Sequence, residues 1–231
     1  MKEKIKQILK RNVITRKLYN TWEKEKIEND IKGKINHLQN AGNDFIIDVN
    51  KALATGNEIF FLDYGSLLGI VREGGIIKHD SDIDFGVSVI NQDTIKQIRR
   101  CLSEHGYKLL SINHVDDSIV AQDTFGKNGI EFDIYYHYIE NENGHVYMIY
   151  RDPSKSYSDN EWDVVVATTK AIHETIDFPF NKSTVRIPKY YLQHIENRYG
   201  PNWRVPDKTY VYWKGNSTSF CNLKGSMEVI R

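Results

Sequence analysis

The sequence predicts an α+β fold in which helices flank an antiparallel or mixed β-sheet. Helical and strand-like patterns intermix along the 231 residues, and turn-forming clusters at residues 125–129 and 141–144 favour hairpins. Hydrophobic residues make up 40% of the chain and charged residues 27%, which is ordinary for a soluble globular protein. The length fits one large domain, or a core domain with appendages.

The first 57 residues are expected to be helical. Residues 1–32 carry Lys and Glu at dense intervals without proline, and residues 34–56 indicate a second helix that ends at a Thr-Gly-Asn breaker. Two interpretations of the basic start of the chain stay open, a solvated helix that packs on the main domain and a segment attracted to an anionic membrane surface. The basic side chains concerned are Lys2, Lys4, Lys6, Lys10, Arg11, Arg16 and Lys17.

Apolar residues at 59–62 predict a buried strand, and a helical pattern at 67–72 follows until Gly74 and Gly75 break it. Downstream, the patterns predict strands at 83–89, 118–124 and 130–138, and helices at 94–105, 161–176 and 189–199. The tail is rich in Pro, Tyr and Trp. The chain is therefore expected to divide into an N-terminal helical segment (1–57), a core (58–177) and an aromatic-rich C-terminal extension (178–231).

Asp82 and Asp84 are the first candidate ligands for a cation. The segment Asp82-Ile83-Asp84-Phe85 alternates polar and apolar residues, so on a strand both carboxylates point to one face while the apolar side chains enter the core. Two carboxylates this close repel each other unless a cation lies between them, and their oxygens suit Mg²⁺ or Mn²⁺. Taken alone, the pair also fits the solvated face of an edge strand.

Asp133 lies in a similar alternating segment, in which it shares a face with Glu131. On a strand beside that of Asp82 and Asp84, its carboxylate would complete a metal site or act as the base that takes a proton from an acceptor hydroxyl. The residue pattern does not decide between these roles.

A second group of residues is predicted to bind phosphate. Gly65 and Ser66 lie between an apolar strand and a helical segment, where glycine allows close approach and a helix start offers unpaired N–H donors. Arg72 and Lys78 would supply cations, although each also fits an ordinary surface position. Asp80 would either bind a second metal ion or orient the basic residues before it.

These motifs resemble the signature of the LicD family, whose usual form has Gly-Ser or Gly-Thr, an arginine and an Asp-x-Asp-x-Asp run. The matching segments are Leu62-Asp63-Tyr64-Gly65-Ser66-Leu67-Leu68-Gly69, then Val71-Arg72, then His79-Asp80-Ser81-Asp82-Ile83-Asp84-Phe85-Gly86. His79 stands where the family usually has an aromatic residue. Phe132-Asp133-Ile134 resembles the family's later acidic strand, and residues 178–188 and 199–206 resemble its C-terminal block.

The resemblance implies a nucleotidyltransferase-type fold, with a mixed sheet flanked by helices and a site that the C-terminal extension completes. It also implies metal-dependent transfer of a phospho-alcohol, such as phosphocholine, ribitol phosphate or glycerol phosphate, from a CDP-linked donor to a sugar hydroxyl, with release of CMP. The acceptor would be a cell-surface glycan or its lipid-linked precursor, as in capsule, teichoic acid or lipopolysaccharide biosynthesis. Tyr199 and Trp203 would stack on the nucleotide or sugar, or simply pack in the C-terminal region.

Two other hypotheses remain. A nucleotidyltransferase that attaches NMP from an NTP to a small hydroxyl compound uses the same Gly-Ser and Asp-x-Asp pattern, and a degenerate relative would bind glycan or membrane without turnover. The formal net charge of +0 provides no overall field that attracts nucleic acid. The two cysteines lie far apart, which favours reduced thiols and a cytoplasmic protein. The sequence has no apolar stretch long enough to span a bilayer, and peripheral contact at the inner face of the membrane would occur through the basic N-terminus.

Overall fold

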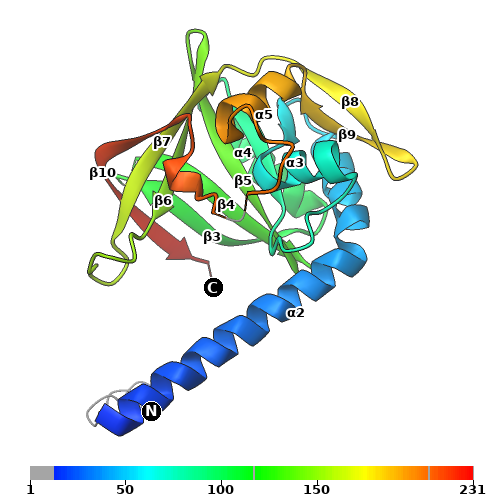
Figure 1. Ribbon diagram of the computed structural model, residues 1–231. Helices are drawn as coiled ribbons and strands as arrows, with labels where there is room; N and C mark the ends of the chain where they lie inside the picture. The colour runs from blue at the N-terminus through cyan, green and yellow to red at the C-terminus, as the bar shows by residue number, and fades with distance from the viewer. Residues whose placement is uncertain (1–12, 117, 208, 231) are drawn as a thin grey trace.

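The computed structural model describes residues 13–116, 118–207 and 209–230, and it has the predicted α+β character (Figure 1). A large mixed sheet and a small two-stranded sheet are flanked by four α-helices within these residues. The elements, in chain order, are α2 (Val13–Leu53), β1 (Phe60–Leu62), α3 (Tyr64–Glu73), β2 (Asp84–Val89), α4 (Thr94–Glu104), β3 (Lys108–Val115), β4 (Ile119–Lys127), β5 (Ile130–Glu140), β6 (Asn143–Tyr150), β7 (Trp162–Lys170), β8 (Thr175–Phe180), β9 (Ser183–Pro188), α5 (Tyr191–Tyr199), the 3-10 helix η1 (Tyr212–Lys214) and β10 (Thr218–Val229).

The large sheet has the strand order β1-β2-β5-β4-β3-β10-β7-β6, and β5 also pairs with β6, so six of its strands form a closed ring. Among the described strands, only β2 and β5 pair in parallel. The remaining pair, β8 and β9, forms the small sheet. Because β10 lies inside the large sheet, the chain after residue 178 contributes to the same body as the core, and the division at that residue stays a prediction.

Helix α2 is one continuous helix of 41 residues, where the sequence predicted two. The predicted interruption lies at Gly33, which is exposed, and a Cβ atom at this position would meet no other atom within 4 Å. The helix continues through Gly33, although glycine in a helix interior costs about 1 kcal/mol relative to alanine. Only the second half of α2 packs on the sheet, and the first half projects away from it (Figure 1). Residues 1–12, which hold most of the predicted basic segment, lie outside the described residues.

The helices predicted at 94–105 and 189–199 are confirmed as α4 and α5, and the strands predicted at 59–62, 83–89, 118–124 and 130–138 as β1, β2, β4 and β5, within a few residues. The helix predicted at 161–176 is wrong, because residues 162–170 form β7. Its β-branched residues, among them Val164, Val165 and Thr169, favour a strand, and β6 and β10 pair with it on both sides. Strands β3, β6, β8, β9 and β10 were not predicted.

The core determines which face of the sheet is available for a site. Phe85 of β2 and Phe132 of β5 are buried and pack edge to face. Phe45 of α2 packs on Phe132 in the same way. Successive strand residues point to opposite faces, so Asp84 and Asp133 lie on the face opposite to that of Phe85 and Phe132. Helix α3 contacts both β2 and α5. No helix among the described residues has both the length and the apolar character to cross a membrane.

The buried part of α2 is expected to contribute strongly to stability. Ile46 is fully buried, and Ile46→Ala should lower the free energy of unfolding by about 2–5 kcal/mol because it leaves a cavity. Ile31, in the same helix, is 43% exposed, and Ile31→Ala should change the free energy of unfolding by no more than about 0.5 kcal/mol. Urea unfolding of both variants tests this, and equal losses would contradict the packing of α2.

Candidate metal site

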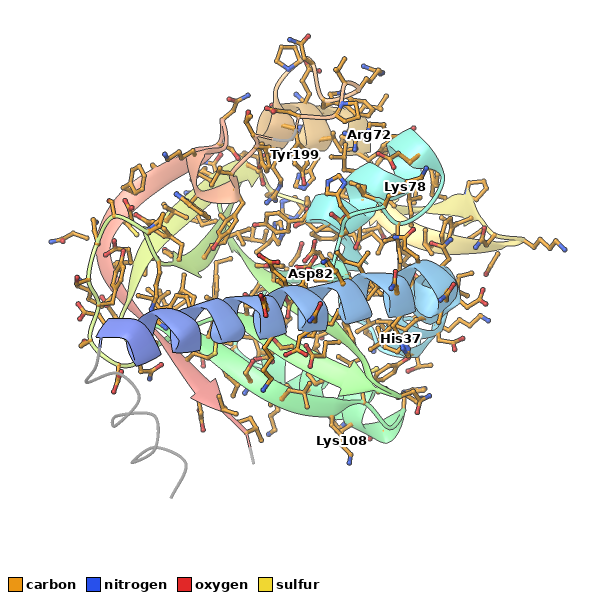
Figure 2. The ribbon with its side chains drawn as sticks, turned by 60° about the horizontal axis from the view of Figure 1, so that its bottom comes forward. His37, Arg72, Lys78, Asp82, Lys108 and Tyr199 are labelled. Carbon is orange, nitrogen blue, oxygen red and sulfur yellow. The ribbon has the colours of Figure 1, made fainter. Side chains whose placement is uncertain are left out.

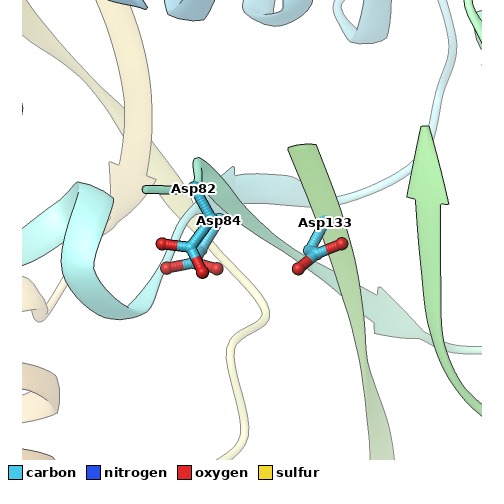
Figure 3. Close-up of side chains that lie close together, drawn as sticks. All are labelled: Asp82, Asp84 and Asp133. Atoms are coloured by element: carbon cyan, nitrogen blue, oxygen red, sulfur yellow. The ribbon is translucent and has the colours of Figure 1, made fainter. Parts of the chain in front are cut away.

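The parallel pairing of β2 and β5 brings the three predicted carboxylates together. Asp84 lies opposite Asp133 in the strand register, and Asp82 precedes Asp84 by two residues. One oxygen from each of the three side chains lies within 4.8 Å of the others (Figure 3). Residues separated by about 50 positions in the sequence thus form one cluster, and each lies on the face that the alternating patterns predicted.

The electrostatics of this cluster favour a cation. Burial, followed by the charges of Asp82 and Asp133, raises the pKa of Asp84 well above its usual value. Burial also raises the pKa of Asp133 to about 6, although the Thr124 hydroxyl donates a hydrogen bond of 2.7 Å to its Oδ1. A divalent cation would remove the repulsion, and a set of carboxylate oxygens alone is the chemistry that Mg²⁺ and Mn²⁺ prefer. The three aspartates therefore fit the predicted metal.

Gly65 lies in the first turn of α3, directly against these acids. A Cβ atom at this position would lie 2.8 Å from Oδ2 of Asp80 and 3.6 Å from Oδ2 of Asp84. Burial and the charge of Asp82 raise the pKa of Asp80 to about 6. Glycine is needed here because any larger residue would displace the Asp80 carboxylate from the start of the helix.

Ser66 holds the backbone of Asp84 in place. Its side chain is 3% exposed, and its hydroxyl accepts a hydrogen bond of 2.9 Å from the backbone N–H of Asp84. The helix begins at Tyr64, three residues earlier than predicted, so Gly65 and Ser66 belong to the helix and not to a preceding loop. Contact of Ser66 with phosphate stays a prediction.

The two predicted phosphate-binding cations differ in their surroundings. Arg72 donates to Glu73 through Nε and Nη2 and to the backbone carbonyl of Trp203 through Nη1, so each nitrogen of its guanidinium already has a partner. Lys78 is exposed. Figure 2 shows Arg72 and Tyr199 at the end of the molecule that α3 and α5 form.

Asp63 forms the centre of a buried hydrogen-bond network that supports the site. It precedes α3 as its N-cap, is fully buried, and accepts from the backbone N–H of Tyr64 at 2.8 Å. Nε2 of His137 donates to Oδ2 at 2.7 Å, Nε2 of His194 donates to Oδ1 at 2.9 Å, and Nη2 of Arg198 lies 3.3 Å from Oδ2. Asp63 therefore both caps α3 and ties its start to β5 and α5.

The charge states within this network follow from its composition. Burial alone would raise the pKa of Asp63, but Arg198 and His194 hold it well below its usual value. Burial lowers the pKa of His137, which therefore donates to Asp63 as a neutral imidazole. Burial opposes the charge of Arg198, and Asp63 more than offsets this and raises the pKa of the guanidinium. The network is a carboxylate–guanidinium pair with two imidazole donors.

Sequence reasoning missed His137 and Arg198. A signal for His137 existed, because it follows Asp133 by four residues in β5 and the alternation of the strand places both side chains on one face. His194 is buried against Asp63. Nothing in the helical pattern of α5 distinguishes Arg198 from a surface arginine.

Aromatic side chains border the acids and the network. The rings of Tyr64 and Tyr135 are 4.5 Å apart, and the Tyr64 hydroxyl donates to the sulfur of Met148 at 3.1 Å. Tyr199 packs on Tyr210. Trp203 is 6% exposed and belongs to the hydrophobic core, so the packing interpretation of this residue is confirmed.

Comparison with known proteins agrees with these motifs. The family model described as LicD/FKTN/FKRP, nucleotidyltransferase domain, matches residues 57–190, which is more than half of the chain. The chain belongs to the LicD/FKTN/FKRP family. Helix α5 and the two network residues that it carries follow directly after the matched segment.

Relatives of this LicD-family chain include three curated proteins named ribitol-5-phosphate transferase FKTN. The protein from Mus musculus is 27% identical over 159 residues, which are 68% of this chain and 32% of that protein. Those from Macaca fascicularis and Homo sapiens are each 26% identical over 157 residues, 67% of this chain and 31% of theirs. The matched segment spans about a third of the length of these relatives.

Removal of one acid is expected to stabilise the metal-free protein. At pH values above about 6, Asp133→Asn should raise the free energy of unfolding. The carboxylate of Asp133 is then charged and poorly solvated in the folded wild type, and the variant lacks this charge. The difference should shrink as the pH falls through 6 towards 4, since the folded wild type becomes protonated. Chemical unfolding with a chelator at several pH values measures the difference.

Addition of Mn²⁺ in the same experiment should reverse the order. The wild type should gain stability from binding, and Asp133→Asn should gain much less. Asp177→Asn is the control, because Asp177 is exposed on β8, and it should follow the wild type in every condition. A difference between wild type and Asp133→Asn that responds neither to pH nor to Mn²⁺ would contradict the assignment of the cluster.

Proposed function

We propose that the protein is a metal-dependent transferase that moves a phospho-alcohol from a CDP-linked donor to a sugar hydroxyl and releases CMP. The observation that carries this proposal is the cluster of Asp82, Asp84 and Asp133, whose oxygens lie within 4.8 Å of one another in a chain of the LicD/FKTN/FKRP family. Gly65 leaves room for the carboxylates of Asp80 and Asp84 beside the start of α3. The proposal includes a nucleotidyltransferase-type fold.

The proposed reaction is an in-line displacement at phosphorus. The acceptor hydroxyl oxygen forms a new bond to the phosphorus that carries the alcohol, and the bond from that phosphorus to the oxygen shared with CMP breaks. CMP leaves with the electron pair of that bond, and a base takes the hydroxyl proton. The substituted phosphate is thereby transferred whole.

Each part of the site has a task in this scheme. Asp82, Asp84 and Asp133 would hold Mg²⁺ or Mn²⁺, which when bound neutralises the diphosphate and stabilises the leaving oxygen. Ser66 keeps Asp84 in place through its backbone N–H. Asp133 is the third ligand or the base. Asp80, beside Gly65, is available for a second cation or for orienting the cluster.

The relatives favour ribitol phosphate as the transferred group, because they are named ribitol-5-phosphate transferases. The acceptor proposed here is a cell-surface glycan or its lipid-linked precursor. The basic residues at the start of the chain would hold the protein at the inner face of a membrane, where a lipid-linked acceptor is presented.

The proposal predicts CMP release that requires both a divalent cation and an acceptor sugar. The measurement is CMP formation from CDP-ribitol, CDP-glycerol and CDP-choline with Mg²⁺ or Mn²⁺. Asp84→Asn should reduce the rate by at least about 100-fold, because the charge that develops on the leaving group loses its stabilisation. His173→Ala should retain the wild-type rate, since His173 is exposed and outside the cluster.

Other outcomes would separate the alternatives. Release of pyrophosphate from an NTP with a small hydroxyl acceptor would replace the proposal with nucleotidyl transfer. Equal activity of Asp84→Asn and the wild type would show that the three acids are not the site. Folded wild-type protein that binds no nucleotide in the presence of metal would indicate a degenerate relative.

A further inference from the structure

A cavity of about 240 Å³ lies between the segment that follows β7, the segment that leads into α5, and α5 itself. Helix α5 contacts both β7 and β9, and Figure 1 shows it between β7 and the small sheet. A water molecule takes up about 30 Å³, so the cavity is larger than a site for one or two waters. It is slightly smaller than the usual sites for drug-sized ligands, which measure about 300–1,000 Å³. The cavity therefore fits a group the size of a single ring.

This cavity is separate from the metal cluster. The Ser88 hydroxyl donates a hydrogen bond of 2.6 Å to the backbone carbonyl of Ile172, which lines the cavity. Ser88 follows Asp84 by four residues in β2, which corresponds to about 13 Å along the strand. His194 also lines the cavity, and its Nε2 donates to Asp63. The cavity thus shares a supporting residue with the candidate site, but none of the three aspartates lines it.

The floor of the cavity is apolar and held in place by the fold. Ala171, Ile172 and Pro188 are buried and line it. The backbone N–H of Ala171 donates to the carbonyl of Glu142 at 2.8 Å, which fixes the segment after β7 against the turn between β5 and β6. A ligand would therefore meet a preformed surface.

Helix α5 presents one polar face to the cavity. Tyr190, Gln193 and Asn197 are spaced by three and four residues, so they lie on one side of the helix, and all three are exposed and line the cavity. The amides of Gln193 and Asn197 have no hydrogen-bond partner within the described residues. Each amide offers donors and an acceptor to a ligand.

The charged residues around the cavity favour neither an anion nor a cation. Lys189 pairs with Glu174 at 2.6 Å, and the remaining lysine and glutamate that line the cavity, Lys170 and Glu142, balance each other in formal charge. The ammonium groups of both lysines lie within 5.7 Å of the centroid of the Tyr190 ring, which disfavours a cationic ligand on that ring. A neutral ligand with many hydrogen-bonding groups fits this lining.

We propose that the cavity binds a neutral sugar ring, which belongs to the acceptor glycan but does not react. Sugar hydroxyl groups both donate and accept, which matches the amides of Gln193 and Asn197 and the balanced charges beside them. The C–H groups of the ring would pack on the apolar floor. Binding of a sugar is independent of the proposed function, and only the assignment of that sugar to the acceptor rests on it.

Titration of the ¹⁵N-labelled full chain with glucose, galactose, N-acetylglucosamine and N-acetylgalactosamine tests the proposal. At least one of these sugars should shift the backbone amide signals of Ile172 and Asn197 and leave those of Asp84 and Asp133 in place. Binding should require no metal, and Asp84→Asn should bind the sugar like the wild type.

A pair of double variants shows whether the cavity is the binding site. Tyr190→Ala combined with Asn197→Ala removes a ring and an amide from the cavity wall, and it should weaken sugar binding by about 10-fold. Leu192→Ala combined with Glu196→Ala is the matched control, because both side chains are exposed on the same helix and neither lines the cavity. This control should bind like the wild type. All four side chains are exposed, so both variants are expected to fold.

The other outcomes are distinct. Cavity signals that none of the sugars shifts would overturn the inference and leave the proposed function intact, as would equal sugar affinity of the wild type and the variant that lacks Tyr190 and Asn197. Shifts caused by inorganic phosphate and by none of the sugars would replace the inference with an anion site. Sugar binding at the cavity of a protein that releases no CMP would support the inference and contradict the proposed function.

Discussion

The buried carboxylate of Asp63 is the interaction on which the rest of the site depends. It lies between β1 and α3, it receives His137 from β5, and it receives His194 and Arg198 from α5. Its own backbone N–H donates to the carbonyl of Asp84. One side chain and its backbone therefore fix the relative positions of a helix start, two strands and a C-terminal helix. A buried carboxylate is tolerated here because both of its oxygens accept hydrogen bonds. Loss of one partner from a buried ion pair typically costs about 3–5 kcal/mol.

The metal cluster depends on a second constraint, the parallel pairing of β2 with β5. A hairpin cannot produce a parallel pair, so the chain makes a long excursion through α4, β3 and β4 before β5 returns beside β2. This pairing puts Asp84 and Asp133 in register, and the neighbouring core residues Phe85 and Phe132 place both carboxylates on the opposite face. Repulsion among the acids is then a consequence of the fold, and a bound cation is the simplest way to relieve it.

The local patterns in the sequence predicted much of this arrangement. Alternation at Asp82–Phe85 and around Asp133 gave the correct faces, because strand periodicity depends only on neighbouring residues. The sequence analysis allowed a strand of Asp133 beside that of Asp82 and Asp84 but did not fix the pairing of β2 with β5, since long-range register has no local signal. The misassigned β7 shows the same limit, because its β-branched residues fit a strand only once β6 and β10 lie beside it. Arg198 looks like any surface arginine until α5 packs against Asp63.

The central claim is that Asp82, Asp84 and Asp133 hold a catalytic divalent cation. The most direct measurement is the anomalous scattering of Mn²⁺ in crystals of the full chain. The account predicts a single strong peak on the open face of β2 and β5, about 2.1 Å from a carboxylate oxygen of each of the three aspartates. Manganese that binds elsewhere, or no manganese at these three residues, would contradict it.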